Sequence, residues 1–156
     1  MKYVTKALLA CGLLVYAASV FLPWFRTSMI GGASITCWSF KAEIHPYPYP
    51  YSSPPYQVMF WSWPSYWTII FMCQILTLLF GLLTLSKKTK GKYGSVFLWL
   101  TLLFSAMSVG TCFLHSAELG VLLTNFGIGF WMASLAFLLL IGSLLMSLTS
   151  EKPSIE

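Results

Sequence analysis

Charged residues are scarce in this sequence, and aspartate is absent from it. Charged side chains make up 8% of the 156 residues, and the acidic ones are four glutamates. A soluble domain carries about 25% charged residues, because its surface must stay hydrated. With 58% hydrophobic residues, this chain lacks the groups to cover a water-facing surface. Composition therefore excludes an ordinary soluble domain and indicates a protein that requires lipid.

Groups for acid–base and metal chemistry are equally scarce. On the side that we expect to face outward, only Glu43 and Glu118 are acidic, and His45 and His115 stand far apart in sequence. The sequence contains no nucleophile elbow, phosphate-binding loop, paired carboxylates or zinc-ligand spacing. It also lacks the basic stripe with stacking aromatic residues that binds nucleic acid. We therefore predict no enzymatic activity, no cofactor, no metal and no nucleic-acid partner.

Four apolar runs are long enough to cross a bilayer. They cover residues 7–24, 65–85, 95–114 and 127–148, and none contains Asp, Glu, Lys, Arg or His. About 20 helical residues span roughly 30 Å, the thickness of the hydrocarbon core. We therefore predict one all-α integral membrane domain over residues 1–156, a four-transmembrane-helix bundle in the lipid bilayer. The first run is expected to be retained, because Tyr16 stands where signal cleavage requires a small residue.

The lysines are distributed unequally between the two sides of such a bundle. The side of both termini holds Lys2, Lys6, Lys87, Lys88, Lys90, Lys92 and Lys152, whereas the other side holds Arg26 and Lys41. Cytoplasmic segments carry an excess of Lys and Arg. We therefore expect the N- and C-termini to be cytoplasmic, and the plasma membrane to be the location.

The first outer loop, residues 25–64, is long and rich in aromatic residues and proline. Tyrosine and proline alternate over residues 45–51, which favours an extended polyproline II conformation. Residues 34–40 alternate small polar with large apolar side chains after a Gly-Gly turn, so a short β-hairpin fits there. Large aromatic side chains provide contact area at low entropic cost. The expected partner-contact residues of this loop are Tyr47, Tyr49, Tyr51, Tyr56, Trp61 and Trp63.

Each apolar run contains small residues at helical spacing. Because lipid tails are as apolar as leucine, membrane helices associate where small residues permit close approach. The expected packing residues are Cys73, Thr77, Gly81, Ala106, Gly110, Gly129 and Ala133, and the first run offers Ala7, Cys11 and Ala18. These stripes fit packing within the bundle, and they fit docking of a partner subunit as well.

The four cysteines divide into two pairs by position. Cys11 and Cys73 lie inside apolar runs, where cysteine acts as a small hydrophobic residue. Cys37 in the first outer loop and Cys112 near the outer end of the third run share the oxidising side. A disulfide between Cys37 and Cys112 would tie the loop to the bundle, and two free thiols are the alternative.

The interiors of the predicted helices hold no ionisable group of the kind that marks ion paths and proton relays. Their most polar residue is Gln74, for which we expect an interhelical hydrogen bond. Pumps, proton-coupled carriers and redox-cofactor subunits are therefore not expected.

The segment Leu22-Pro23-Trp24-Phe25-Arg26, followed by Ile30-Gly31 and then Cys37-Trp38, resembles the start of the first extracellular segment in claudin-like tetraspanners. The resemblance covers the first helix and about 20 residues after it. It implies four helices, cytoplasmic termini and a large first outer loop with a short sheet. This loop holds one cysteine where those proteins have two after Gly-Leu-Trp, so the resemblance extends to architecture and not to barrier function.

Three functions fit these features. The first is a non-catalytic accessory subunit of a larger integral membrane complex, such as a respiratory or oxidase assembly, with other integral membrane subunits as partners. The second is a self-assembling, claudin-like envelope or junction protein, which would form homo-oligomers. The third is a small channel or carrier, for which Gln74, Thr77, Ser105, Ser108 and Thr111 supply only a thin polar path.

Overall fold

The computed structural model describes residues 3–28, 34–45, 56–59, 66–86, 92–118 and 125–150. Its helices are α1 (Tyr3–Val20), α2 (Tyr66–Leu85), α3 (Lys92–Glu118) and α4 (Ile128–Ser150). All four are long and apolar enough to cross a membrane. The prediction of an integral membrane protein built on a four-helix bundle is therefore confirmed.

Two helices, α1 and α3, differ by several residues from the bounds that we expected. Helix α1 covers Tyr3–Val20 instead of residues 7–24, because Pro23 has no backbone N–H and disfavours helical geometry in the residue before it. The N–H groups of Phe21 and Leu22 close the helix on the carbonyls of Ala18 and Ser19. Helix α3 covers Lys92–Glu118 instead of residues 95–114, since hydropathy does not detect polar turns at helix ends.

The bundle consists of two antiparallel helix pairs. Helix α1 packs mainly on α4, and α2 packs mainly on α3. In the first pair, a Cβ at Gly12 would lie 3.2 Å from Leu140, so the two helices approach closely there. In the second pair, Phe80 of α2 stacks on Phe97 and Phe104 of α3.

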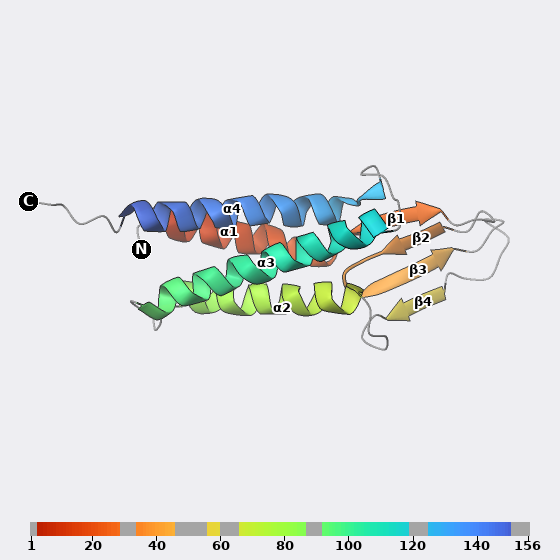
Figure 1. Ribbon diagram of the computed structural model, residues 1–156, viewed down its shortest axis with the longest axis horizontal. Coiled ribbons are helices and arrows are strands. Elements are labelled where there is room, and N and C mark those ends of the chain that lie inside the picture. Colours follow the sequence, from red (N-terminus) through yellow and green to blue (C-terminus); the bar gives the residue numbers. More distant parts are fainter. Residues whose placement is uncertain are drawn as a thin grey trace, which may run out of the picture.

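The segment between α1 and α2, which we call the first outer loop after its predicted side, contains a four-stranded antiparallel sheet, where the sequence favoured one short hairpin. Its strands are β1 (Phe25–Ser28), β2 (Ser34–Cys37), β3 (Lys41–His45) and β4 (Tyr56–Met59), in the order β1-β2-β3-β4. Strand β1 was not expected because it begins directly after the first helix, and β4 because it follows a proline-rich stretch. Figure 1 shows this sheet at one end of the bundle, and the start of α1 and the end of α4 at the other.

Backbone hydrogen bonds attach the sheet to the helices. The Trp24 N–H donates to the Cys37 carbonyl at 2.8 Å, which joins the end of α1 to β2. The Gly127 N–H donates to the Trp24 carbonyl at 2.8 Å, and the Gly129 N–H donates to the Pro23 carbonyl at 2.8 Å. The start of α4 is therefore bound to the segment between α1 and β1.

Candidate functional site

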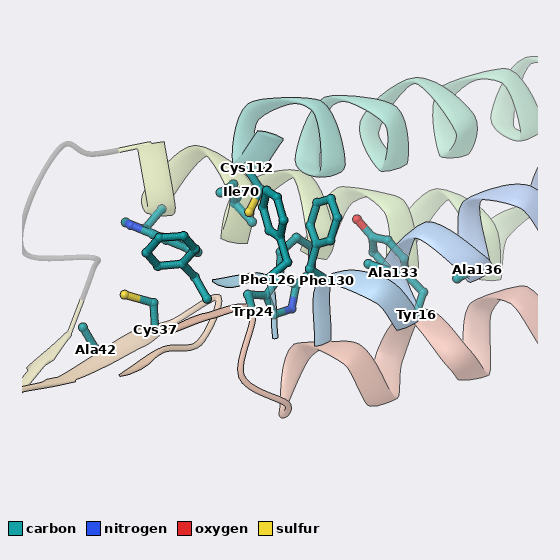
Figure 2. Packing of buried hydrophobic residues seen from close by; sticks show 12 residues of the cluster. Tyr16, Trp24, Cys37, Ala42, Ile70, Cys112, Phe126, Phe130, Ala133 and Ala136 are labelled. Atoms are coloured by element: carbon teal, nitrogen blue, oxygen red, sulfur yellow. The ribbon is translucent and has the colours of Figure 1, made fainter. Parts of the chain in front are cut away.

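Aromatic rings and cysteines gather where the sheet meets the helices. We call this the outer cluster; its members include Trp24, Phe25, Cys37, Trp67, Cys112, Phe126 and Phe130, all buried. The ring centroids of Phe126 and Phe130 lie 4.1 Å apart, and Phe130 meets Trp24 edge-on at 6.2 Å. Figure 2 shows these rings packed between the sheet and the helices. Such ring contacts stabilise the attachment of the sheet beyond the burial of apolar area.

Cys37 and Cys112 both belong to the outer cluster, and the structure holds them as free thiols. They are near enough to interact electrostatically, so the predicted partners do share one site. Burial raises the pKa of the Cys37 thiol to about 12, because the apolar surroundings disfavour the thiolate. Cys37 is therefore protonated and unreactive at neutral pH. The disulfide stays a prediction about oxidised protein.

His115 lies beside the outer cluster near the end of α3. Its ring stacks on Tyr66 with centroids 4.6 Å apart, and it meets Trp67 edge-on at 6.2 Å. His45 is in β3, and its side chain lies outside the described part of the chain. Among the residues that the structure describes, no three His, Cys, Asp or Glu side chains come close enough to hold a metal ion.

A second group of side chains lies inside the bundle, and we call it the interior polar cluster. It consists of Tyr16 from α1, Gln74 and Thr77 from α2, and Ser105 and Ser108 from α3, all fully buried. The Tyr16 hydroxyl hydrogen-bonds the Ser108 hydroxyl across the bundle. The sequence pattern did not lead us to predict a hydrogen bond for Tyr16, although the hydroxyl of a tyrosine in the middle of an apolar run requires a partner.

Several predicted packing residues lie inside the chain's own bundle. A Cβ at Gly81 would lie 2.3 Å from the Leu13 side chain, so α1 and α2 approach at that glycine. A Cβ at Gly129 would lie 2.6 Å from the Trp24 ring. Cys73, Thr77 and Ala133 are buried as well. Two glycines that the sequence pattern did not indicate also lie at contacts: a Cβ would lie 2.1 Å from the Pro23 carbonyl oxygen at Gly127 and 3.2 Å from Leu140 at Gly12.

Other predicted packing residues face away from the bundle. Gly110 has no heavy atom within 4 Å of the position where a Cβ would lie, and Ala106 one turn earlier is partly exposed. On α1, Ala7, Cys11 and Ala18 are exposed. Ala7, Cys11, Ala18 and Gly110 therefore face away from the neighbouring helices of the described chain.

The predicted partner-contact aromatics cannot be placed as side chains. Tyr47, Tyr49, Tyr51, Trp61 and Trp63 lie outside the described residues, and Tyr56 is described only as backbone in β4. Comparison with known proteins adds no family, since no protein-family model and no curated protein matches this chain.

Proposed function

We propose that this chain is a non-catalytic accessory subunit of a larger integral membrane complex, and that it docks a neighbouring subunit on the outward face of α3. The observation that carries this proposal is the open space at Gly110. In a helix interior, glycine is about 1 kcal/mol less favourable than alanine. At Gly12 and Gly81 this cost is offset by close contact with neighbouring helices. At Gly110 no heavy atom of another element lies within 4 Å of the position that a Cβ would take.

The position of Gly110 on α3 supports docking of a helix. At about 100° per residue, Gly110 lies in the middle of the face that also carries Trp99, Leu103, Met107 and Leu114. These four side chains are between 43% and 64% exposed. Together with Ala106, Gly110 forms a small-xxx-small step in the middle of large apolar side chains, the pattern that lets a second membrane helix approach closely.

The exposed face of α1 supports a second neighbour. Ala7, Cys11 and Ala18 are exposed there, and Leu14 between them is 71% exposed. Their spacing of four, three and four residues is the heptad spacing of a helix–helix seam. A subunit that fills gaps between larger subunits needs two such faces.

The accessory role agrees with the chemistry of the spans. Away from Lys6 in α1 and His115 near the end of α3, the four spans contain none of the acidic, basic or histidine side chains that mark transport paths, so we assign catalysis and transport to the neighbours. A respiratory or oxidase assembly of the plasma membrane is the proposed class of complex. The lysine distribution supports cytoplasmic N- and C-termini.

The test is extraction of the protein from its native membrane in mild detergent, with mass spectrometry of the subunits that co-purify in stoichiometric amount. We expect a defined set of larger membrane subunits, which Gly110→Leu releases. Gly142→Leu is the matched control, because Gly142 has the same open space on α4 but the large residues Leu138 and Met146 four positions away, so it belongs to no small-xxx-small step. Migration of the wild-type chain alone would contradict the accessory role.

The sheet at the outer end favours a second candidate, a self-assembling envelope or junction protein with claudin-like arrangement. A meander of four antiparallel strands has outer edges, and such edges pair readily with another copy. This candidate expects homo-oligomers without foreign subunits in the same purification, and deletion of residues 34–45 should reduce them to monomers.

A further inference from the structure

The interior polar cluster contains polar atoms without a partner in the described part of the chain. Both amide atoms of Gln74, Nε2 and Oε1, lack a hydrogen bond, and so does the Ser105 hydroxyl. Both residues are fully buried. Unpaired polar atoms in an apolar interior are strongly destabilising, so nearly all such atoms in folded proteins find a partner. The interhelical hydrogen bond that we expected for Gln74 is therefore not made by the described residues, and the partner of this amide has to be identified.

Ring contacts at both ends of α2 establish which residues of α3 lie opposite Gln74. Near the outer end, Tyr66 stacks on His115, and farther along α2, Phe80 stacks on Phe97 and Phe104. In this antiparallel register Gln74 lies at the level of residues 105–108. The Ser105 and Ser108 hydroxyls, which are the buried groups of that turn, therefore lie at the level of Gln74. Gln74 shares its face of α2 with Gly81, where α2 approaches Leu13 of α1.

The Tyr16 hydroxyl lies at the same level. It hydrogen-bonds Ser108, and it is close enough to interact with the Thr77 and Ser105 hydroxyls. Thr77 is one helical turn from Gln74 on the same face of α2. Polar groups from α1, α2 and α3 therefore converge on one small region of the interior.

The donors and acceptors of this region can be assigned one by one. The Ser108 hydroxyl donates to the Ser105 carbonyl at 3.0 Å, so it accepts from Tyr16, and the Thr77 hydroxyl donates to the Cys73 carbonyl at 2.8 Å. Two groups remain without a hydrogen bond. The Gln74 amide offers two donor hydrogens and an acceptor oxygen, and the Ser105 hydroxyl can both donate and accept. A molecule that satisfies them must be small, uncharged, and able to donate and accept.

We propose that Gln74 and Ser105 bind a buried water molecule where α1, α2 and α3 converge, beside the Tyr16 hydroxyl. Buried waters form about three hydrogen bonds, which the unpaired Gln74 amide and Ser105 hydroxyl and the free acceptor position of the Tyr16 hydroxyl supply. This water joins three helices at one point inside the membrane. It also gives the fully buried Gln74 amide the hydrogen-bond partner that it otherwise lacks.

Radiolytic footprinting of the whole protein in detergent tests this proposal, because X-ray pulses split bound water into radicals that oxidise adjacent side chains. Cys73 belongs to the same stretch of α2 as Gln74 and is 4% exposed, whereas Cys112 is 1% exposed and lies in the apolar outer cluster. We expect Cys73 to be oxidised several-fold faster than Cys112, and Tyr16 faster than the equally buried Trp24. Equal rates within each pair in the wild-type protein would overturn the proposal.

Two variants assign the water to its ligands. Gln74→Leu should lower the oxidation of Cys73 and Tyr16 to the level of Cys112, while Cys112 itself stays unchanged. Ser105→Ala should lower the oxidation of Cys73 and Tyr16 in the same way. Because it is the smaller change, it provides the test if the Gln74→Leu variant does not fold. Undiminished oxidation of Cys73 in a folded variant would mean that Gln74 and Ser105 do not hold the water, and would overturn the assignment.

Discussion

The membrane bundle and the outer end of this protein are held together by different interactions. Within the bundle, hydroxyl groups mostly bond the carbonyl four residues earlier in their own helix, as Thr77, Thr84 and Thr101 do. At the outer end, backbone bonds join segments far apart in sequence, such as Trp24 to Cys37 and Gly127 to Trp24. The helices therefore associate through the fit of their surfaces, while the outer end depends on specific hydrogen bonds.

The apolar contacts differ in the same way. The inner half of the bundle is a cluster of leucines, namely Leu9, Leu13, Leu98, Leu102, Leu140 and Leu144. The outer cluster is dominated by aromatic rings in edge-on and stacked contacts. Leucines tolerate exchange for residues of similar volume, whereas ring contacts depend on orientation. We therefore expect mutations of matched size to be more harmful at the outer end.

The largest expected effect is that of Gly127→Ala. The new Cβ would lie 2.1 Å from the Pro23 carbonyl oxygen, and this backbone cannot shift without breaking the bonds between α4 and the α1–β1 segment. We expect a loss of about 3 kcal/mol in the free energy of unfolding, measured by thermal unfolding in detergent. Gly142→Ala in the same helix has open space and should be neutral or slightly stabilising. Similar effects of both changes would contradict the importance of this junction.

Gly81→Ala tests the bundle side of the comparison. Its Cβ would also clash, at 2.3 Å, but with the flexible end of the Leu13 side chain instead of backbone. We expect a smaller loss, about 1 to 2 kcal/mol, in the same unfolding assay. Combined with Leu13→Ala, the loss in the free energy of unfolding should be smaller than the sum of the two single losses, because the shorter side chain makes room for the new Cβ. A loss as large as that of Gly127→Ala would show that the bundle is as intolerant as the outer end.

Tyr16→Phe tests the one cross-helix hydrogen bond of the interior polar cluster that the structure describes. The variant keeps the ring and removes the hydroxyl that meets Ser108. Ser108 retains its bond to the Ser105 carbonyl, so we expect a loss of only about 1 kcal/mol. In unfolding measurements, the double variant Tyr16→Phe/Ser108→Ala should lose less free energy of unfolding than the sum of the two single losses. Full additivity would mean that the two hydroxyls are not coupled.

The smallest effect concerns reactivity and not stability. Because burial raises the pKa of Cys37 to about 12, its alkylation should be slow at pH 8 and rise about tenfold per pH unit without a plateau below pH 11. The Cys37 peptide of the protein unfolded in denaturant, where the thiol is hydrated, should react faster and serves as the reference in peptide mass spectrometry. A plateau near pH 9 would contradict the burial of Cys37. A product two hydrogens lighter, joining Cys37 to Cys112, would instead establish the disulfide.

The existence of the four helices was predictable, because a run of about 20 apolar residues has no satisfactory state in a membrane other than a helix. Their number and approximate bounds follow from composition along the chain. The places where the prediction erred are local and explicable: Pro23 ends α1 early, and polar residues extend α3 to Lys92–Glu118. The turn at residues 31–32 and the alternation at 34–40 indicated one hairpin of the sheet.

The direction in which each small residue faces was decided only by the tertiary structure. Gly81 and Gly110 occur in similar small-residue stripes, yet one contacts Leu13 and the other has open space. The same holds for strands β1 and β4, for the pairing of α1 with α4 and α2 with α3, and for the convergence of Tyr16 with Ser108. The sequence alone determines that this chain crosses a membrane, since partition into lipid depends on the composition of each segment by itself. Which surfaces meet depends on contacts between segments distant in the chain, and no local pattern contains them.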